Sequence, residues 1–162
     1  MDPRRRALLA ATTALAWPGA ARAEWDRGEA VTLPPLTLLD GTRFDPATLK
    51  GKVVVLEFWA SWCPFCTRQN PHIEALHRAQ QARGLEVLAV SIDKTAQAAA
   101  DYMKQHGYTF RAGLATPEYL RIFRMRRALP QVYVIGRDGR IARIEQGEMF
   151  EEDIRDLAAL LK

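Results

Sequence analysis

The sequence predicts one three-layer α/β domain with a mixed central sheet. Two apolar runs, residues 53–59 and 85–92, are typical of strands buried on both faces, and helical periodicity separates and follows them. Residues 131–135 and 141–146 flank the turn sequence Arg-Asp-Gly-Arg and predict an antiparallel hairpin. Strands that alternate with helices and end in a hairpin indicate parallel and antiparallel neighbours in one covered sheet.

An edge hairpin is expected before the first buried strand. Residues 31–39 are apolar and β-prone, Asp40-Gly41 is a turn signal, and residues 42–44 can pair back onto the first arm. The Pro34-Pro35 pair restricts this arm to a sheet edge, because proline lacks the amide that a central strand needs. An Asp-Pro pair then predicts a short capped helix over residues 45–51.

Helices are predicted between and after the buried strands. Apolar residues recur at helical spacing after the first strand until Gly84, and the second helix stops at Gly107. A Thr-Pro pair starts a third helix, and an amphipathic pattern closes the chain. The expected helices are residues 63–83, 95–106, 118–126 and 151–161.

The first 23 residues have the pattern of a secretory signal. Three arginines precede a short apolar run, Ala7 to Trp17, and Ala21-Arg22-Ala23 places small residues before a cut. We therefore expect a signal peptide over 1–23, cleavage after Ala23 and a periplasmic mature domain over 24–162. The alternative is a retained membrane anchor, although the apolar run is shorter than the ~20 residues of a spanning helix. The Sec and twin-arginine routes both remain open.

The charge pattern excludes a nucleic-acid-binding surface. The 162-residue chain has a formal net charge of +4, but four arginines and one aspartate lie within the expected signal, so the mature domain is nearly neutral. The one local cluster comprises arginines 121, 124, 126 and 127, and a solvated helix face explains it better than a docking patch for an acidic partner.

The chain has two cysteines, Cys63 and Cys66, and three interpretations compete for them. A structural zinc site normally needs four ligands, and His72 lies nine residues after Cys63, on the far side of the helix, so we expect His72 and His77 to face solvent. A structural disulfide persists in exported proteins, but so short a ring adds little stability. A redox couple fits best.

The helix start favours a thiolate. Cys63 stands where an N-cap belongs, Pro64 suits the first helical position, and Cys66 falls at the third. The Cys63 sulfur can therefore accept a free amide hydrogen, and the helix dipole also lowers a cysteine pKa at this position. We expect Cys63 to be the nucleophile and the shielded Cys66 to be the resolving cysteine.

Three further features accompany the pair: the stretch VVVLEFWASWCPFC, Pro71 in the next helix, and Leu129-Pro130 before the last hairpin. Together they resemble a thioredoxin-fold protein. The edge hairpin, the spacing from Cys66 to Pro130 and the sequence LPQVYVIGRDGRI are similar to exported TlpA-like thiol-disulfide oxidoreductases, which include cytochrome c maturation reductases. The resemblance implies a thioredoxin-like three-layer α/β/α sandwich with a central mixed sheet and an added N-terminal β-hairpin.

The resemblance also implies a cis peptide at Leu129-Pro130 that faces the cysteines, with the Leu129 backbone pairing with an extended substrate segment. Trp62, Pro64 and Phe65, together with Leu129, form the expected apolar platform for a partner polypeptide. Phe65 departs from the family, since many relatives have proline there. Trp59, in contrast, is expected in the core.

Glu57 is an anomaly in a buried strand. Burial disfavours an ionised carboxyl, so we expect a raised pKa and a role as the acceptor of the Cys66 proton. TlpA-like reductases usually have a glutamate where this chain has Gln69. We therefore hypothesise that the acid has moved to the opposite side of the sulfurs.

These residues predict an exported thiol-disulfide oxidoreductase, and the family resemblance implies that it reduces protein disulfides. The resemblance implies no cofactor beyond the redox-active Cys63–Cys66 disulfide, protein disulfides as substrates, and a membrane or exported thiol as electron donor. A disulfide oxidase or isomerase is the first alternative. A copper-handling protein that binds Cu(I) through both thiolates is the alternative of another class.

Overall fold

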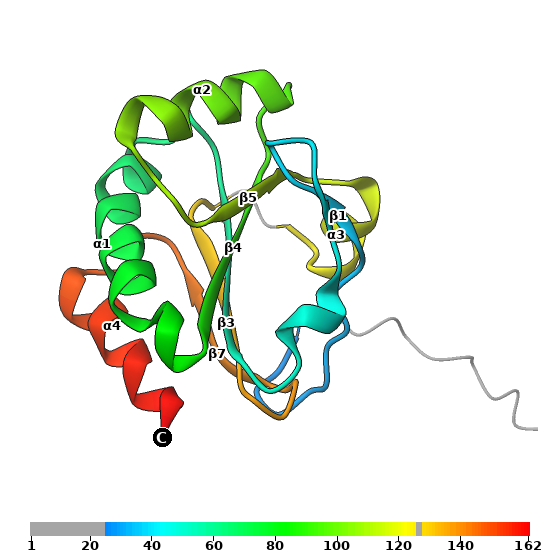
Figure 1. Ribbon diagram of the computed structural model, residues 1–162, viewed down its shortest axis with the longest axis vertical. Helices are drawn as coiled ribbons and strands as arrows, with labels where there is room; N and C mark the ends of the chain where they lie inside the picture. The colour runs from blue at the N-terminus through cyan, green and yellow to red at the C-terminus, as the bar shows by residue number, and fades with distance from the viewer. Residues whose placement is uncertain (1–24, 126–127) are drawn as a thin grey trace, which may run out of the picture.

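The computed structural model describes residues 25–125 and 128–162, in which a five-stranded sheet has the order β5-β4-β3-β6-β7 (Figure 1). β3 pairs in parallel with β4 and antiparallel with β6. β4 pairs in parallel with β5, and β6 pairs antiparallel with β7, so the predicted mixed sheet is present. The strands are β3 (Val53–Trp59), β4 (Leu85–Ser91), β5 (Arg111–Leu114), β6 (Gln131–Ile135) and β7 (Ile141–Gln146).

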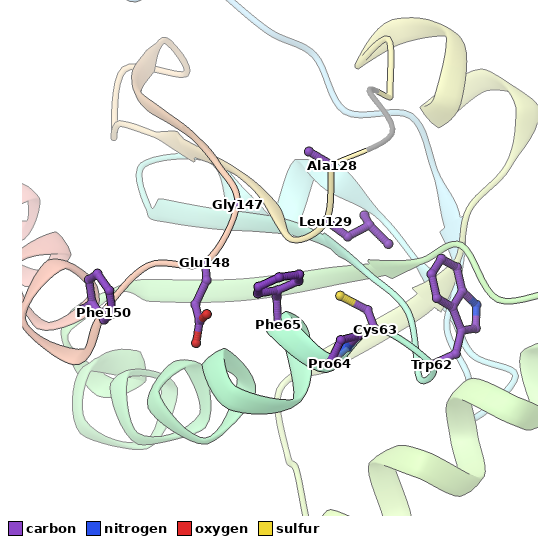
Figure 2. A pocket seen from close by; sticks show the side chains of 9 residues that line it. All are labelled: Trp62, Cys63, Pro64, Phe65, Ala128, Leu129, Gly147, Glu148 and Phe150. Atoms are coloured by element: carbon purple, nitrogen blue, oxygen red, sulfur yellow. The ribbon is translucent and has the colours of Figure 1, made fainter.

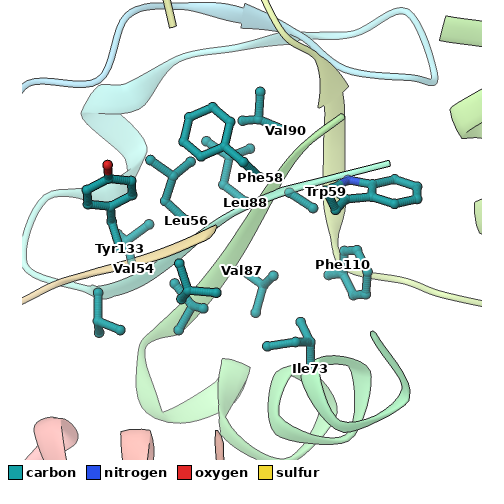
Figure 3. Close-up of a cluster of buried hydrophobic side chains, with 14 of the residues drawn as sticks. Val54, Leu56, Phe58, Trp59, Ile73, Val87, Leu88, Val90, Phe110 and Tyr133 are labelled. Atoms are coloured by element: carbon teal, nitrogen blue, oxygen red, sulfur yellow. The ribbon is translucent and has the colours of Figure 1, made fainter. Parts of the chain in front are cut away.

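β3 is the centre of the fold because every one of its side chains is buried. Its alternate residues point to opposite faces of the sheet, as the period of two in a strand requires. Phe58 and Leu56 lie on one face, whereas Trp59 lies on the face where Ile73 and Val87 pack (Figure 3). A nearly unbroken apolar run therefore supplies two core layers at once.

Helices cover both faces of the sheet (Figure 1). α1 (Pro64–Gln80) and α4 (Glu151–Asp156) pack together on one side, and α3 (Pro117–Ile122) lies on the other. The remaining helical segments are α2 (Ala96–His106) and the 3-10 turns η1 (Pro46–Leu49), η2 (Gln81–Arg83) and η3 (Leu157–Leu161). This is the three-layer arrangement that the sequence predicts.

The N-terminal hairpin consists of β1 (Leu36–Thr37) and β2 (Arg43–Phe44), and it lies against β5. A bridge joins Leu38 to Gly113, and a Cβ at Gly113 would meet Leu36 Cδ2 at 2.6 Å and the Thr37 carbonyl oxygen at 2.7 Å. The Thr37 backbone cannot move aside as the end of a flexible side chain can. The hairpin therefore requires glycine at this position.

Gly113→Ala is expected to lower the free energy of unfolding by about 1–3 kcal/mol, the usual cost of overpacking a close contact. Urea unfolding followed by circular dichroism measures this as a lower midpoint with an unchanged slope. An unchanged midpoint would show that the hairpin moves away from β5 at no cost.

Several sequence predictions differ from the structure in detail. Strand β5 was not predicted, because a four-residue segment that includes a glycine has little strand character of its own. The closing helix is α-helical only to Asp156 and continues as the 3-10 turn η3. The first hairpin arm pairs over two residues only, in place of the expected 31–39.

Two of the sequence predictions concern residues outside the ranges that the structure describes. The signal over 1–23 lies outside the described residues, as do Arg126 and Arg127 of the basic cluster. The other two members of that cluster, Arg121 and Arg124, are exposed. Within the described ranges, no helix combines the length and apolar character needed to cross a membrane.

Candidate active site

The cysteine pair lies where β3 ends and α1 begins. Cys63 has extended backbone angles, φ −87° and ψ 113°, and its sulfur accepts the Cys66 amide hydrogen at an S···N distance of 3.2 Å. Pro64 occupies the first helical position, where the missing amide costs nothing. The predicted N-cap geometry of Cys63 is confirmed.

Both cysteines are free thiols in this structure, and both are largely shielded from solvent. Cys63 is 3% exposed and Cys66 is fully buried. Burial raises the pKa of the Cys66 thiol, and the hydrogen bond that this thiol makes with Cys63 raises it further. The Cys66 thiol donates to the Cys63 sulfur, and the two Sγ atoms lie 2.6 Å apart.

A hydrogen-bonded network that the sequence analysis did not anticipate fixes the loop before Cys63. Asp93 follows β4 and accepts hydrogen bonds from the Ser61 amide at 3.0 Å and from the Ser61 hydroxyl at 2.7 Å. Ser91 also donates to Asp93 at 2.7 Å. Because Ser61 and Asp93 are far apart in sequence, only the parallel pairing of β3 with β4 brings them together.

Glu57 lies fully buried on β3, on the face covered by α1. Desolvation raises the pKa of its carboxyl to about 8, while a hydrogen bond from Gln69 opposes the shift. Its Oε1 accepts from Gln69 Nε2 at 2.7 Å, whereas Oε2 has no hydrogen-bond partner among the described residues. The predicted raised pKa is confirmed, and one oxygen remains available to carry a proton.

Gln69 and Glu57 belong to one polar cluster, so the hypothesis that the acid lies on the opposite side of the sulfurs from position 69 is wrong. Both side chains are buried together between β3 and α1. When the Asn70 side-chain amide is oriented so that its hydrogen-bonding groups have partners, its nitrogen donates to the Cys66 carbonyl oxygen at 3.1 Å and to Glu57 Oε1 at 3.3 Å. The cluster therefore connects the acid to the backbone of the second cysteine.

The Leu129-Pro130 peptide bond is cis, as the resemblance implied, and it immediately precedes β6. Leu129 lies beside Cys63, whose sulfur points into the space between Leu129 and Phe65 (Figure 2). This space is an open, mainly apolar groove of about 490 Å³. Its lining residues are Trp62, Cys63, Pro64, Phe65, Ala128, Leu129, Gly147, Glu148 and Phe150.

All four residues of the predicted platform line this groove, and two of its aromatic rings are open to solvent. Trp62 is 65% exposed and Phe65 is 49% exposed. Phe150, which is 70% exposed, extends the apolar surface, but the sequence analysis missed it. Phe150 lies in the segment that connects β7 to α4, and the path of this segment brings it to the groove. Trp59 is fully buried, as expected.

An ion pair closes the side of the groove. Arg68 donates to both carboxylate oxygens of Glu148, at 2.8 Å and 2.6 Å, and its guanidinium lies 4.8 Å from the centre of the Phe65 ring. The Arg68 guanidinium holds the pKa of Glu148 below its usual value. The sequence analysis missed this pair, because nothing local signals a contact across 80 positions.

One of the two histidines expected to face solvent is placed differently from the prediction. His77 is 6% exposed, and its Nδ1 has no partner among the described residues, so the expectation that it faces solvent is wrong. It lies on the buried side of α1, where desolvation lowers its pKa. His72 remains partly exposed, with Nδ1 3.9 Å from Glu151. Among the described residues, no three His, Cys, Asp or Glu side chains cluster as a metal site.

Comparison with known proteins identifies the family. The Redoxin family model matches residues 26–161, nearly the whole described chain. The chain belongs to the Redoxin family. This Redoxin-family protein is 29% identical over 123 residues to the thiol-disulfide oxidoreductase ResA of Bacillus subtilis, a match that covers 76% of this chain and 69% of ResA. ResA of Halalkalibacterium halodurans is also 29% identical, over 128 residues.

Solved structures show the same fold. A Chlorobium tepidum structure described as a candidate thiol:disulfide interchange protein DsbE has a TM-score of 0.78 and 24% identity, with 86% of this chain and all of that chain covered. A thioredoxin-family thiol:disulfide interchange protein from the same organism has a TM-score of 0.74 and 24% identity, covering 88% and 99%. The Redoxin-family chain therefore has a thioredoxin-like fold, with an extra N-terminal hairpin.

Proposed function

We propose that this thiol-disulfide oxidoreductase is exported and reduces the disulfides of client proteins through Cys63 and Cys66. The observation that carries the proposal is the placement of the two sulfurs. Cys63 caps α1 with its sulfur in the open groove, and Cys66 lies fully buried one turn behind it. The outer sulfur can meet a client, and the inner one can reach only the outer.

The chemistry transfers two electrons to the client. The Cys63 thiolate attacks one sulfur of a client disulfide, so that bond breaks, a mixed disulfide forms and the first client thiolate leaves. Cys66 then loses its proton and attacks the Cys63 sulfur, which releases the second client thiol and leaves the Cys63–Cys66 disulfide. An exported or membrane-bound thiol donor returns the pair to the dithiol.

Glu57 accepts the Cys66 proton in this scheme. The Cys66 thiol is hard to ionise in its buried position, so its attack needs a base that is equally shielded from water. Glu57 is buried against the helix that carries Cys66, and its pKa of about 8 leaves a minority of the carboxyl ionised at neutral pH. That ionised fraction takes the proton as the new disulfide forms.

The groove accommodates an extended client segment. Trp62, Phe65 and Phe150 offer apolar contacts around the Cys63 sulfur, and the Arg68–Glu148 pair neutralises the charge at the groove wall. Leu129 presents its backbone beside the sulfur, where a client strand can pair with it. An uncharged, apolar wall of this kind suits a flexible polypeptide rather than a small charged thiol.

The setting we propose is the periplasm, with cytochrome c maturation as the process served. The sequence pattern of residues 1–23 and the resemblance to TlpA-like reductases support this setting. The same resemblance supports the reducing direction over an oxidase or isomerase. The reduction potential, measured against glutathione, distinguishes these directions, because a value as oxidising as ~−120 mV is that of a disulfide oxidase.

Trapping the mixed disulfide tests the function. The Cys66→Ser variant keeps the attacking sulfur but lacks the resolving one, so it is expected to accumulate disulfide-linked complexes with exported client proteins. Non-reducing electrophoresis detects them, and dithiothreitol dissolves them. The double variant Cys63→Ser/Cys66→Ser is the matched control and forms none. If Cys66→Ser traps no protein from the exported fraction, proteins are not the substrates.

A further inference from the structure

Gln69 joins two parts of the site that are far apart in sequence. It is fully buried in the second turn of α1. Its Nε2 donates to Glu57 Oε1 at 2.7 Å, and its Oε1 accepts the Met149 amide hydrogen, also at 2.7 Å. Met149 lies between Glu148 and Phe150, two residues of the groove wall. One side chain therefore contacts both the buried acid and the backbone that supports the client groove.

Few other side chains meet both demands. An amide has a donor and an acceptor whatever the pH, whereas a carboxylate at this position accepts only. An apolar side chain would leave the Met149 amide and one Glu57 oxygen without partners in a fully buried place, and such groups are nearly always paired in proteins. The amide is thus the neutral group that satisfies both neighbours at once.

The two oxygens of the Glu57 carboxyl differ in their hydrogen-bond partners. Oε1 accepts from Gln69 and Asn70, so it is occupied by donors, while Oε2 has no partner among the described residues. A proton can therefore reside on Oε2 without breaking any contact of Oε1. Donation to Oε1 also stabilises the ionised carboxyl more than the neutral one, as a hydrogen bond to a charged acceptor does.

We propose that Gln69 is a positioning residue: it ties Glu57 by one oxygen, leaves the other to take the Cys66 proton, and anchors the Met149 backbone under the groove. The inference rests on the proposed function, because it assigns Gln69 a part in the resolving step. The attack by Cys66 is therefore expected to be sensitive to substitution of Gln69, whereas the first attack by Cys63 is expected to be insensitive to it.

The two steps can be measured separately with the aryl disulfide dithiobis(nitrobenzoate) and the reduced protein. Attack by Cys63 breaks the disulfide and releases one coloured thiolate. Attack by Cys66 on the resulting mixed disulfide releases the second and leaves the Cys63–Cys66 disulfide. Stopped-flow absorbance at several pH values then gives a rate constant for each release. In the wild type, the second rate constant is expected to rise with pH, with a midpoint near the Glu57 pKa of about 8.

Gln69→Met keeps the length and volume of the side chain but removes both hydrogen bonds. The midpoint of the second release is expected to move up by about one pH unit, because the ionised carboxyl loses its donor. At pH 7 the second release then becomes about tenfold slower, and the first release stays unchanged. Gln80→Met, the same change near the end of α1, is the matched control and moves neither.

The Glu57→Gln background decides whether Gln69 acts through the acid. There the second release is slow and lacks the midpoint near pH 8, and adding Gln69→Met is expected to slow it less than twofold. An unmoved midpoint in Gln69→Met, or an equal slowing in both backgrounds, overturns the proposal. Failure of the proposed function looks different, because Cys66→Ser would then trap no exported protein, whatever the Gln69 variants do to the two releases.

Discussion

Replacing Cys63 with serine is expected to abolish the protein's catalysis of insulin-disulfide reduction by dithiothreitol. A serine hydroxyl is not ionised near neutral pH and cannot attack a disulfide as a thiolate does. Cys66 cannot substitute for Cys63, because it is fully buried behind it and burial raises the pKa of its thiol. The turbidity of precipitating insulin measures the rate, which falls to that of the reaction without protein.

The matched control is Cys66→Ser, whose first attack survives. It is expected to release one thiolate from dithiobis(nitrobenzoate), whereas Cys63→Ser releases none within the same time. Circular dichroism of both variants shows whether the fold is kept. Residual turnover by Cys63→Ser above the background rate would assign the attack to Cys66 and reverse the roles of the two sulfurs.

Replacing Glu57 with glutamine is expected to change how the stability of the reduced protein depends on pH. The carboxyl ionises at about 4.5 when the chain is unfolded, but burial in the folded protein raises its pKa to about 8. Between these values the folded state binds a proton that the unfolded state does not. The stability of the wild type therefore falls as pH rises through this window, by ~1.4 kcal/mol per pH unit from this group alone.

Glu57→Gln lacks this dependence, because glutamine stays neutral in both states. Its free energy of unfolding relative to the wild type is expected to rise between pH 5 and pH 8 by roughly 4 kcal/mol, an upper value since buried groups relax. Urea unfolding of the reduced proteins at each pH measures the difference. Exposed Glu152, changed to Gln, is the control and should track the wild type. Parallel curves for Glu57→Gln and the wild type would mean that Glu57 is not neutral when buried.

Local patterns in the sequence predicted most of the fold. The apolar run of β3, the hairpin of β6 and β7, and the glycine that ends α2 each depend on neighbours within a few residues. The N-cap geometry of Cys63 has the same origin, since a cysteine followed by proline at a helix start needs no distant partner. β5 escaped prediction because its pairing with β4 supplies the order that its own residues do not.

The sequence by itself determined which sulfur caps the helix, and it placed an acid in the central strand. Only the tertiary structure decided that His77 is buried, that Glu57 and Gln69 share one cluster, and that Glu148 and Phe150 complete the groove. The physical reason is that burial, and the pKa shifts that follow from it, depend on which distant segments pack together. The Gln69 contact with Met149 spans 80 positions, and no local pattern encodes such a distance.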